Sequence, residues 1–144
     1  MDIHGIHGID HWESVAKNAI SIAQTNGADQ LVVELFGFIH DSCRISDDYD
    51  PDHGLRAANW MSEWIKDYID LNKIQFNLLY EAIKNHNKGE TTLDPTIGSC
   101  WDADRLELGR LDIYPDVNKM STQLCQDESF IEWKMREMDY FYDF

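Results

Sequence analysis

Four ionisable residues lie on or beside segments whose apolar residues predict a buried helix face. They are His11, His40, Asp41 and Asp104. A buried carboxylate costs free energy unless it is paired with a charge or bound to a metal ion. Two such carboxylates among histidines are most simply explained by a cation that they share. The sequence therefore predicts that these residues, although distant along the chain, converge on a metal ion.

The predicted ligands limit which ions the site can bind. Neutral imidazole nitrogens and anionic carboxylate oxygens suit Mn, Fe, Co, Ni, Zn or Mg, with coordination positions left for water. The set contains no thiolate, which argues against a closed structural zinc site. Cys43, Cys100 and Cys125 form no CxxC motif, and their odd number and wide separation favour reduced structural thiols.

The charge of the chain excludes one class of partner. The formal net charge is −15, and binding to the phosphate backbone of a nucleic-acid polymer needs a basic surface that this chain lacks. Six of the twelve basic residues nevertheless lie within a few residues of a candidate histidine or aspartate: Arg44, Arg56, Lys84, Lys88, Arg105 and Arg110. They form either a local anion site or ordinary cations on solvated helix faces.

The length of 144 residues and the hydrophobic content of 43% predict one domain, residues 1–144, with a single core. The longest apolar runs are too short for a membrane span, so no membrane partner is expected. The N-terminal stretch MDIHGIHGID has neither a basic start nor an apolar signal core, which favours a cytoplasmic location.

Apolar residues recur at helical spacing and do not alternate strictly, which predicts an all-α bundle of about six helices. The predicted helices cover approximately residues 11–26, 29–41, 50 onward, 72–88, 97–111 and 127–142. Asp10 is the expected N-cap of the first helix, with Glu13 at the capping-box position, and Gly27 ends it. Asp50 is expected to cap the third helix, with Pro51 at its first position.

Helical spacing also predicts which side chains point inward. In the fifth helix Asp104 lies on the same face as Trp101, Leu108 and Leu111. Three tryptophans are expected in the core rather than on a base-stacking surface: Trp60, Trp64 and Trp101.

The C-terminal segment 127–144 is rich in acidic and aromatic residues. A helix there would place Phe130, Trp133, Glu137, Tyr140 and Phe141 roughly along one stripe. Packing of this stripe on the domain is the favoured interpretation, and a homodimer contact is the alternative because aromatic residues are enriched at interfaces.

The order His11, His40-Asp41, Asp104 resembles the H…HD…D signature of the HD-domain superfamily of metal-dependent phosphohydrolases. The segment DADRLELG, residues 102–109, is similar to the last motif of small bacterial nucleotide-hydrolysing members. The match covers roughly residues 7–112. The resemblance implies an HD-domain-like helical bundle in which these four residues bind the metal.

The resemblance also assigns roles around the last motif. In the family motif, the ligand aspartate is followed by a variable residue and then by an apolar one. In DADRLE the second aspartate, Asp104, matches this pattern, because Arg105 and Leu106 follow it. Asp102 is then expected to contact the metal ligands rather than the metal ion itself. Arg105 matches a position that often contacts phosphate, and with Lys88, His7 and Arg56 it forms the predicted substrate-binding set.

Two further histidines, His53 in DPDHGLRAA and His86 in IKNHNKG, have two possible roles under the resemblance. They either bind substrate or donate a proton beside one metal ion, or they are ligands to a second ion. The spacing does not decide between these roles. His7 matches an extra histidine that precedes the metal-binding histidine in the nucleotide-hydrolysing branch.

The main functional prediction is a metal-dependent phosphohydrolase that acts on a small phosphorylated substrate, a nucleotide by the resemblance. The ion would lower the pKa of a bound water molecule to roughly 7 to 9, and Asp41 would help to position that water. Basic residues would neutralise charge on the phosphoryl oxygens, and His53 or His86 would protonate the leaving group. The alternatives are a two-iron oxygenase of the HD-like type and a non-catalytic signalling module that binds metal or nucleotide.

Overall fold

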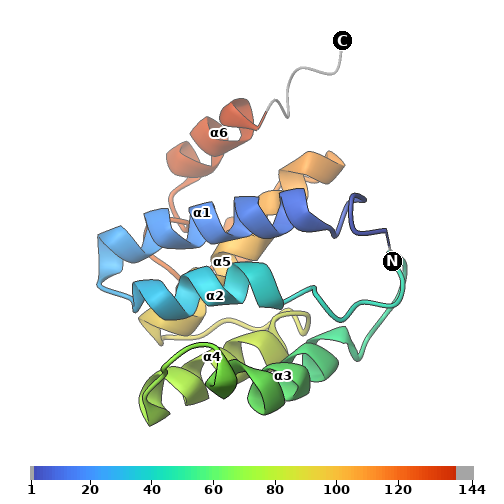
Figure 1. The fold of residues 1–144 in the computed structure, drawn as a ribbon. Helices are drawn as coiled ribbons and strands as arrows, with labels where there is room; N and C mark the ends of the chain where they lie inside the picture. The colour runs from blue at the N-terminus through green and yellow to red at the C-terminus, as the bar shows by residue number, and fades with distance from the viewer. Residues whose placement is uncertain (1, 139–144) are drawn as a thin grey trace.

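The computed structural model describes residues 2–138, which form six α-helices, three short 3₁₀ helices and no strand (Figure 1). The α-helices are α1 (Ile9–Asn26), α2 (Gln30–Ile39), α3 (His53–Trp64), α4 (Lys73–Asn85), α5 (Pro95–Leu106) and α6 (Glu128–Glu137). The predicted all-α fold with six helices is confirmed. Within the described residues, no helix combines the length and the apolar character that a membrane span requires.

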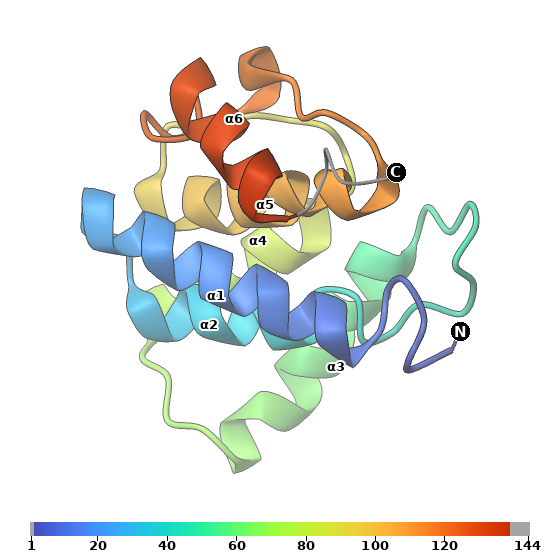
Figure 2. The ribbon, with the colours of Figure 1, turned by 90° about the horizontal axis from the view of Figure 1, so that it is seen from above.

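Two helix pairs and a crossing helix build the core. Helix α1 packs along α2, α3 packs along α4, and α5 contacts α1, α2 and α4 (Figure 1). Helix α6 lies at the opposite end of the molecule from α3 and α4, and the view from above shows it over α5 (Figure 2). Each helix contributes fully buried apolar side chains, among them Val15, Phe36, Met61, Leu79, Leu106 and Ile131.

The first helix begins earlier than the cap pattern predicts. Its N-cap is Gly8, which makes no side-chain cap hydrogen bond, and Asp10 lies inside the first turn. The predicted capping box of Asp10 and Glu13 is therefore wrong, although a carboxylate in the first turn still meets the positive end of the helix dipole. The predicted end at Gly27 is confirmed: this residue has φ 74° and donates its N–H to the carbonyl of Ala23.

The third helix begins later than predicted because Asp50 has other partners. Its carboxylate accepts the backbone N–H of Ile45 at 2.9 Å and both of its oxygens lie 2.7 Å from Nη2 of Arg56. The N-cap is Asp52 and the first helical residue is His53, so the predicted capping role of Asp50 is wrong.

The fifth predicted helix is divided into two parts. Asp94 caps α5 by accepting the N–H of Ile97, and the α-helix ends at Leu106. A 3₁₀ helix, η2 (Glu107–Leu111), continues the chain, and its C-cap is Asp112, which has φ 59°. The tighter 3₁₀ geometry places the side chains of η2 in directions that a continuous α-helix would not allow.

Two of the three tryptophans predicted in the core are half-exposed. Trp60 and Trp64 are 47% and 48% exposed, because α3 turns the face of Ala57 and Met61 toward the interior instead. Trp101 is buried, as predicted.

The last helix packs through a face other than the predicted stripe. Ile131 and Met135 are buried, and Phe130 of the stripe is partly buried against the core, whereas Trp133 is 51% exposed. The other two aromatic residues of the stripe, Tyr140 and Phe141, lie outside the described residues.

Candidate metal centre

The structure brings together all six residues predicted as ligands to one or two metal ions. They are His11, His40, Asp41, His53, His86 and Asp104. They come from the first turn of α1, the C-terminal end of α2, the start of α3, the C-terminal end of α4 and the last turn of α5. Segments that are far apart in the sequence therefore meet at one cluster.

Four of these residues form a first group of donor atoms. Nε2 of His11 lies 3.1 Å from Nε2 of His40, and the two nitrogens lie 3.2 and 3.4 Å from Oδ2 of Asp41. Oδ1 of Asp104 lies 3.3 Å from both nitrogens. The four predicted ligands thus direct one donor atom each at a common point.

The remaining two histidines form a second group with the other oxygen of Asp41. Nε2 of His53 lies 2.9 Å from Nε2 of His86, and Oδ1 of Asp41 lies 3.2 and 3.4 Å from these nitrogens. One carboxylate therefore contributes one oxygen to each group. A carboxylate with one oxygen in each group would be able to hold a cation at either group.

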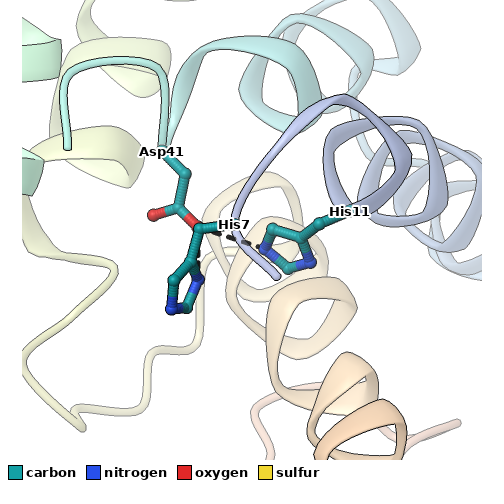
Figure 3. Close-up of side chains that lie close together, drawn as sticks. All are labelled: His7, His11 and Asp41. Atoms are coloured by element: carbon teal, nitrogen blue, oxygen red, sulfur yellow. Dashed lines mark ion pairs between the residues drawn. The ribbon is translucent and has the colours of Figure 1, made fainter. Parts of the chain in front are cut away.

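His7 also lies at the cluster. Its Nδ1 is 3.4 Å from Oδ2 of Asp41, so His7 and His11 both lie next to the same carboxylate oxygen (Figure 3). Trp12 fixes the segment by donating its indole N–H to the carbonyl of His7 at 2.7 Å. Nδ1 of His7 is buried and, apart from this ion pair with Asp41, has no hydrogen-bond partner among residues 2–138.

Helix ends explain how His40 is oriented. The last carbonyls of an α-helix lack partners within the helix. Nδ1 of His40 lies 3.1 Å from the carbonyl oxygen of Phe36 and 3.0 Å from that of Gly37, near the end of α2. A carbonyl only accepts, so Nδ1 carries the proton, and in the neutral ring Nε2 is left with its lone pair directed at the cluster.

His53 and His86 are oriented in the same way. Nδ1 of His53 donates to the carbonyl of Asp50 at 2.5 Å, and Nδ1 of His86 donates to the carbonyl of Ile83 at 2.6 Å. In the neutral rings both Nε2 lone pairs face each other and the carboxylate of Asp41. Such an arrangement is repulsive unless a proton or a metal cation lies between the donor atoms, so these residues fit a bound metal ion.

The electrostatics of the cluster favour positive charge. Burial lowers the pKa of His40, but the charges of Asp41 and Asp104 outweigh this and raise it above 6.5. For His11, burial and Arg110 lower the pKa, and hydrogen bonds that its ring donates to the same two carboxylates raise it to about 9. Burial raises the pKa of both carboxyl groups, yet the neighbouring histidines hold the pKa of Asp41 and Asp104 well below 3.8. Without a metal ion, protonation of His11 and His40 therefore supplies the positive charge that balances the two carboxylates.

Two glycines allow the helices to approach closely enough for the histidines to meet. A Cβ on Gly37 would lie 2.5 Å from the backbone of Ala16, where α2 crosses α1. A Cβ on Gly54 would lie 2.8 Å from the carbonyl oxygen of Lys84, where α3 meets α4. The first contact brings His40 near His11, and the second brings His53 near His86.

The cluster opens into a cavity of about 180 Å³. Its lining includes three arginines, Arg44, Arg105 and Arg110. Nε of Arg44 lies 3.4 Å from Oδ1 of Asp41, and Nε of Arg110 donates to Nδ1 of His11 at 3.1 Å. Arg44 and Arg110 are two of the six cations that the sequence places near candidate residues, although neither was predicted individually to bind substrate.

Glu107 is a further residue of the cavity that sequence reasoning did not identify. Its Oε1 accepts from Nδ2 of Asn18 at 3.1 Å, and its Oε2 lies 3.5 Å from Nε of Arg110. Burial raises the pKa of this carboxyl group. Glu107 lies three residues after Asp104 and three residues before Arg110. Residues at that spacing share a helix face, so the spacing was the signal by which Glu107 could have been identified.

The two aspartates of DADRLE have separate roles. Asp102 is fully buried, and its carboxylate accepts the N–H of Ser121 at 2.8 Å and both the N–H and the hydroxyl of Thr122 at 2.7 Å. It thus holds the segment after η3 (Val117–Lys119) rather than supporting the ligands, contrary to the expectation from the sequence. Asp104 is the aspartate that the structure brings to the histidines.

The predicted substrate-binding residues lie in different places. Arg105 and His7 line the cavity. Arg56 does not, since it binds the carboxylate of Asp50 and donates to the carbonyl of Cys43 at 3.2 Å. Lys88 lies in a neighbouring hollow of about 390 Å³, which shares three lining residues with the cavity: Arg44, His53 and Asn87.

Comparisons of the chain with protein-family models, with curated proteins and with solved structures found no match.

Proposed function

We propose that this protein is a metal-dependent phosphohydrolase of the HD type, with two metal positions, that acts on a small phosphorylated substrate such as a nucleotide. The observation that carries the proposal is the position of two unpaired guanidinium nitrogens beside the histidine and aspartate cluster. Nη2 of Arg105 and Nη1 of Arg110 are buried without a hydrogen-bond partner among residues 2–138, and both residues line the cavity. Buried donors of this kind favour an anionic ligand.

Distances between donor atoms support the metal positions. Ligands about 2.0–2.1 Å from an ion are about 2.8–3.0 Å apart in octahedral geometry and about 3.3–3.4 Å apart in tetrahedral geometry. The separations in the two groups run from 2.9 Å, between His53 and His86, to 3.4 Å, between His40 and Asp41. The lone pairs of His40, His53 and His86 already point inward, so these ligands need no new orientation to bind an ion.

The cavity size supports a phosphoryl group as the part of the substrate that reacts. A volume of about 180 Å³ is well below the roughly 300–1,000 Å³ typical of pockets that enclose a whole drug-sized ligand. The remainder of the substrate then lies in the neighbouring hollow, where Lys88 and the 89% exposed ring of Tyr49 are available.

Each part of the site has a task in this reaction. Divalent ions held by the two groups would polarise a phosphoryl oxygen and acidify a water molecule. Arg105 and Arg110 bind the phosphoryl oxygens, on which charge gathers in the transition state. Asp41 holds the two groups at a fixed separation. His53 and His86 serve as ligands rather than as proton donors, because both nitrogens of each ring are engaged.

The decisive experiment measures phosphate release from a panel of nucleoside mono-, di- and triphosphates. Metal-free protein is loaded with Mn²⁺, Mg²⁺ or Co²⁺ and compared with Asp41→Ala and with Asp70→Ala, which removes an exposed carboxylate that lines neither the cavity nor the neighbouring hollow. We expect turnover that requires metal, survives Asp70→Ala and is lost in Asp41→Ala. Turnover that persists in Asp41→Ala would contradict the proposal.

The same assay separates the two rival functions. A two-iron oxygenase would consume dioxygen and act on substrates without phosphate when it is loaded with iron under air. A binding module would retain nucleotide in equilibrium dialysis but release no phosphate with any ion. Either result would replace the hydrolase proposal.

A further inference from the structure

Two contacts hold the guanidinium group of Arg105. Its Nη1 donates to the carbonyl of Lys119, the last residue of η3, at 2.6 Å. Its central carbon lies 5.7 Å from the centre of the Trp101 ring, and Trp101 donates its indole N–H to the carbonyl of Ala82 at 3.0 Å. Nη2 is buried without a partner among residues 2–138, and Arg105 lines the cavity. The contacts to Lys119 and Trp101 therefore determine where this unpaired nitrogen lies.

The position of the Lys119 carbonyl depends in turn on the residues that follow it. The carboxylate of Asp102 accepts the N–H of Ser121 at 2.8 Å and both the N–H and the hydroxyl of Thr122 at 2.7 Å. Only Met120 separates Lys119 from Ser121, and its side chain is buried in the core. A shift of Ser121 and Thr122 would therefore move the carbonyl to which Arg105 donates.

Asp102 and Arg105 hold the same short segment from one helix. They lie three residues apart on α5, a spacing at which side chains are neighbours on a helix surface. Asp102 fixes residues 121 and 122, and Arg105 contacts residue 119. Hydrogen bonds to an ionised carboxylate are stronger than those between neutral groups, so the contacts of the fully buried Asp102 dominate this arrangement.

We propose that Asp102 is a positioning residue for phosphate binding, because it holds the segment whose Lys119 carbonyl orients the guanidinium group of Arg105. The inference rests on the phosphate-binding role that the proposed function gives Arg105. It adds a buried carboxylate that touches neither metal nor substrate and acts on the substrate only through Arg105.

A double-mutant cycle tests whether Asp102 acts through Arg105. Titration calorimetry in excess Mg²⁺ measures the affinity for inorganic phosphate in wild type, Arg105→Met, Asp102→Asn and the variant that carries both changes. We expect phosphate to bind roughly tenfold more weakly in Arg105→Met and roughly fivefold more weakly in Asp102→Asn. In the double variant we expect a roughly tenfold loss, whereas independent effects would multiply to roughly fiftyfold.

Asp29→Asn is the control for general destabilisation. The carboxylate of Asp29 also accepts a backbone N–H and a side-chain donor, from Val32 at 3.1 Å and from Gln75 at 3.0 Å. Asp29 lines neither the cavity nor the neighbouring hollow. We expect this variant to lose stability but to bind phosphate as wild type does. Equal weakening of phosphate binding in Asp29→Asn and Asp102→Asn would overturn the inference.

The outcomes separate this inference from the function on which it rests. Weaker binding in Arg105→Met with wild-type affinity in Asp102→Asn would overturn the positioning role alone, and so would a double variant weakened roughly fiftyfold. Wild-type affinity in Arg105→Met, or no binding of phosphate by wild type, would overturn both.

A milder variant decides the question if Asp102→Asn does not fold, which circular dichroism melts reveal. Thr122→Val removes the hydroxyl that donates to Asp102 and leaves the carboxylate and both backbone contacts in place. We expect phosphate to bind roughly threefold more weakly in this variant, with no further loss when Thr122→Val is added to Arg105→Met. Wild-type phosphate affinity in Thr122→Val would then overturn the inference.

Discussion

Nε2 of His53 lies 2.9 Å from Nε2 of His86, although each ring donates its other nitrogen's proton to a backbone carbonyl. Hydrogen bonds to backbone carbonyls therefore orient both rings, and such bonds also orient His40. Backbone hydrogen bonding and metal binding are therefore linked, since the nitrogen not used by the backbone is left for the cation.

Substitutions at the two aspartates should change the number of bound ions differently. Asp41→Asn removes the charge shared by both groups, so we expect both ions to be lost. Asp104→Asn affects only the group of His11 and His40, so the ion at His53 and His86 should remain. Elemental analysis after loading with Mn²⁺ and gel filtration measures ions per chain. Asp48→Asn, an exposed change, should leave two.

One ion per wild-type chain would instead indicate a single metal position, with His53 and His86 beside it. Equal losses in Asp41→Asn and Asp104→Asn would contradict the bridging role of Asp41.

Asp102→Asn should affect folding and not the number of ions. The amide retains only one acceptor oxygen, so at least one of the buried donors of Ser121 and Thr122 loses its partner. We expect a loss of about 1–3 kcal/mol in the free energy of unfolding, measured in urea with a chelator present. Mn²⁺ stoichiometry of the folded variant should equal that of wild type, and a loss of one ion would assign a ligand role to Asp102.

Alanine at either close-contact glycine should separate one pair of histidines. Gly37→Ala forces α2 from α1 and should weaken the group of His11 and His40, whereas Gly54→Ala should weaken the other group. Each change should cost about 1–3 kcal/mol of stability because the new methyl group meets backbone atoms. Gly27→Ala is the control.

Gly27 has φ 74° and open space around its Cβ position, so alanine there costs about 1 kcal/mol through backbone strain alone. The metal affinity of Gly27→Ala should match that of wild type. Calorimetry on the three variants checks this, and equal weakening in all three would show that the effect is general destabilisation.

The pH dependence of stability should reverse in direction when metal is bound. In chelator, the raised pKa of His40 contributes stability that is present below pH 6.5 and is lost as the pH rises through the raised value, at up to about 1.4 kcal/mol per pH unit. The lowered pKa values of Asp41 and Asp104 contribute stability that is present above pH 3.8 and is lost at more acidic pH.

With Mn²⁺ present, protons compete with the ion for the same nitrogens, so the stabilisation by metal should grow as the pH rises from 6 to 8.5. Melting temperatures in chelator and in Mn²⁺ across this range test both directions. A metal-free protein whose melting temperature rises from pH 6 to pH 8.5 would contradict the pKa assignment of His40.

Residue types and their spacing were sufficient to predict the six helices and to single out His11, His40, Asp41 and Asp104, whereas His53 and His86 were possible ligands only under the family resemblance. Helical periodicity depends on local geometry, and a buried ionisable residue is recognisable wherever apolar neighbours recur every three or four positions. Helical spacing placed Asp104 on an apolar face, and the family motif favoured it over Asp102 as the ligand. The structure gives these aspartates different surroundings.

The cap positions, by contrast, depended on partners elsewhere in the chain. Asp50 was expected to cap a helix, but Arg56 and the N–H of Ile45 engage its carboxylate. The exposure of Trp60 and Trp64 likewise depends on which face of α3 meets α4, and periodicity does not specify this when both faces carry apolar residues.

The sequence by itself determined which residues are capable of binding a cation and on which helices they lie. Only the tertiary structure decided that Asp41 offers one oxygen to each group and that Arg110 contacts a histidine 99 positions away. The reason is physical: helical periodicity is a property of neighbours along the chain. Contacts between helices depend instead on crossing angles and close approaches, which are set jointly by all the packed surfaces.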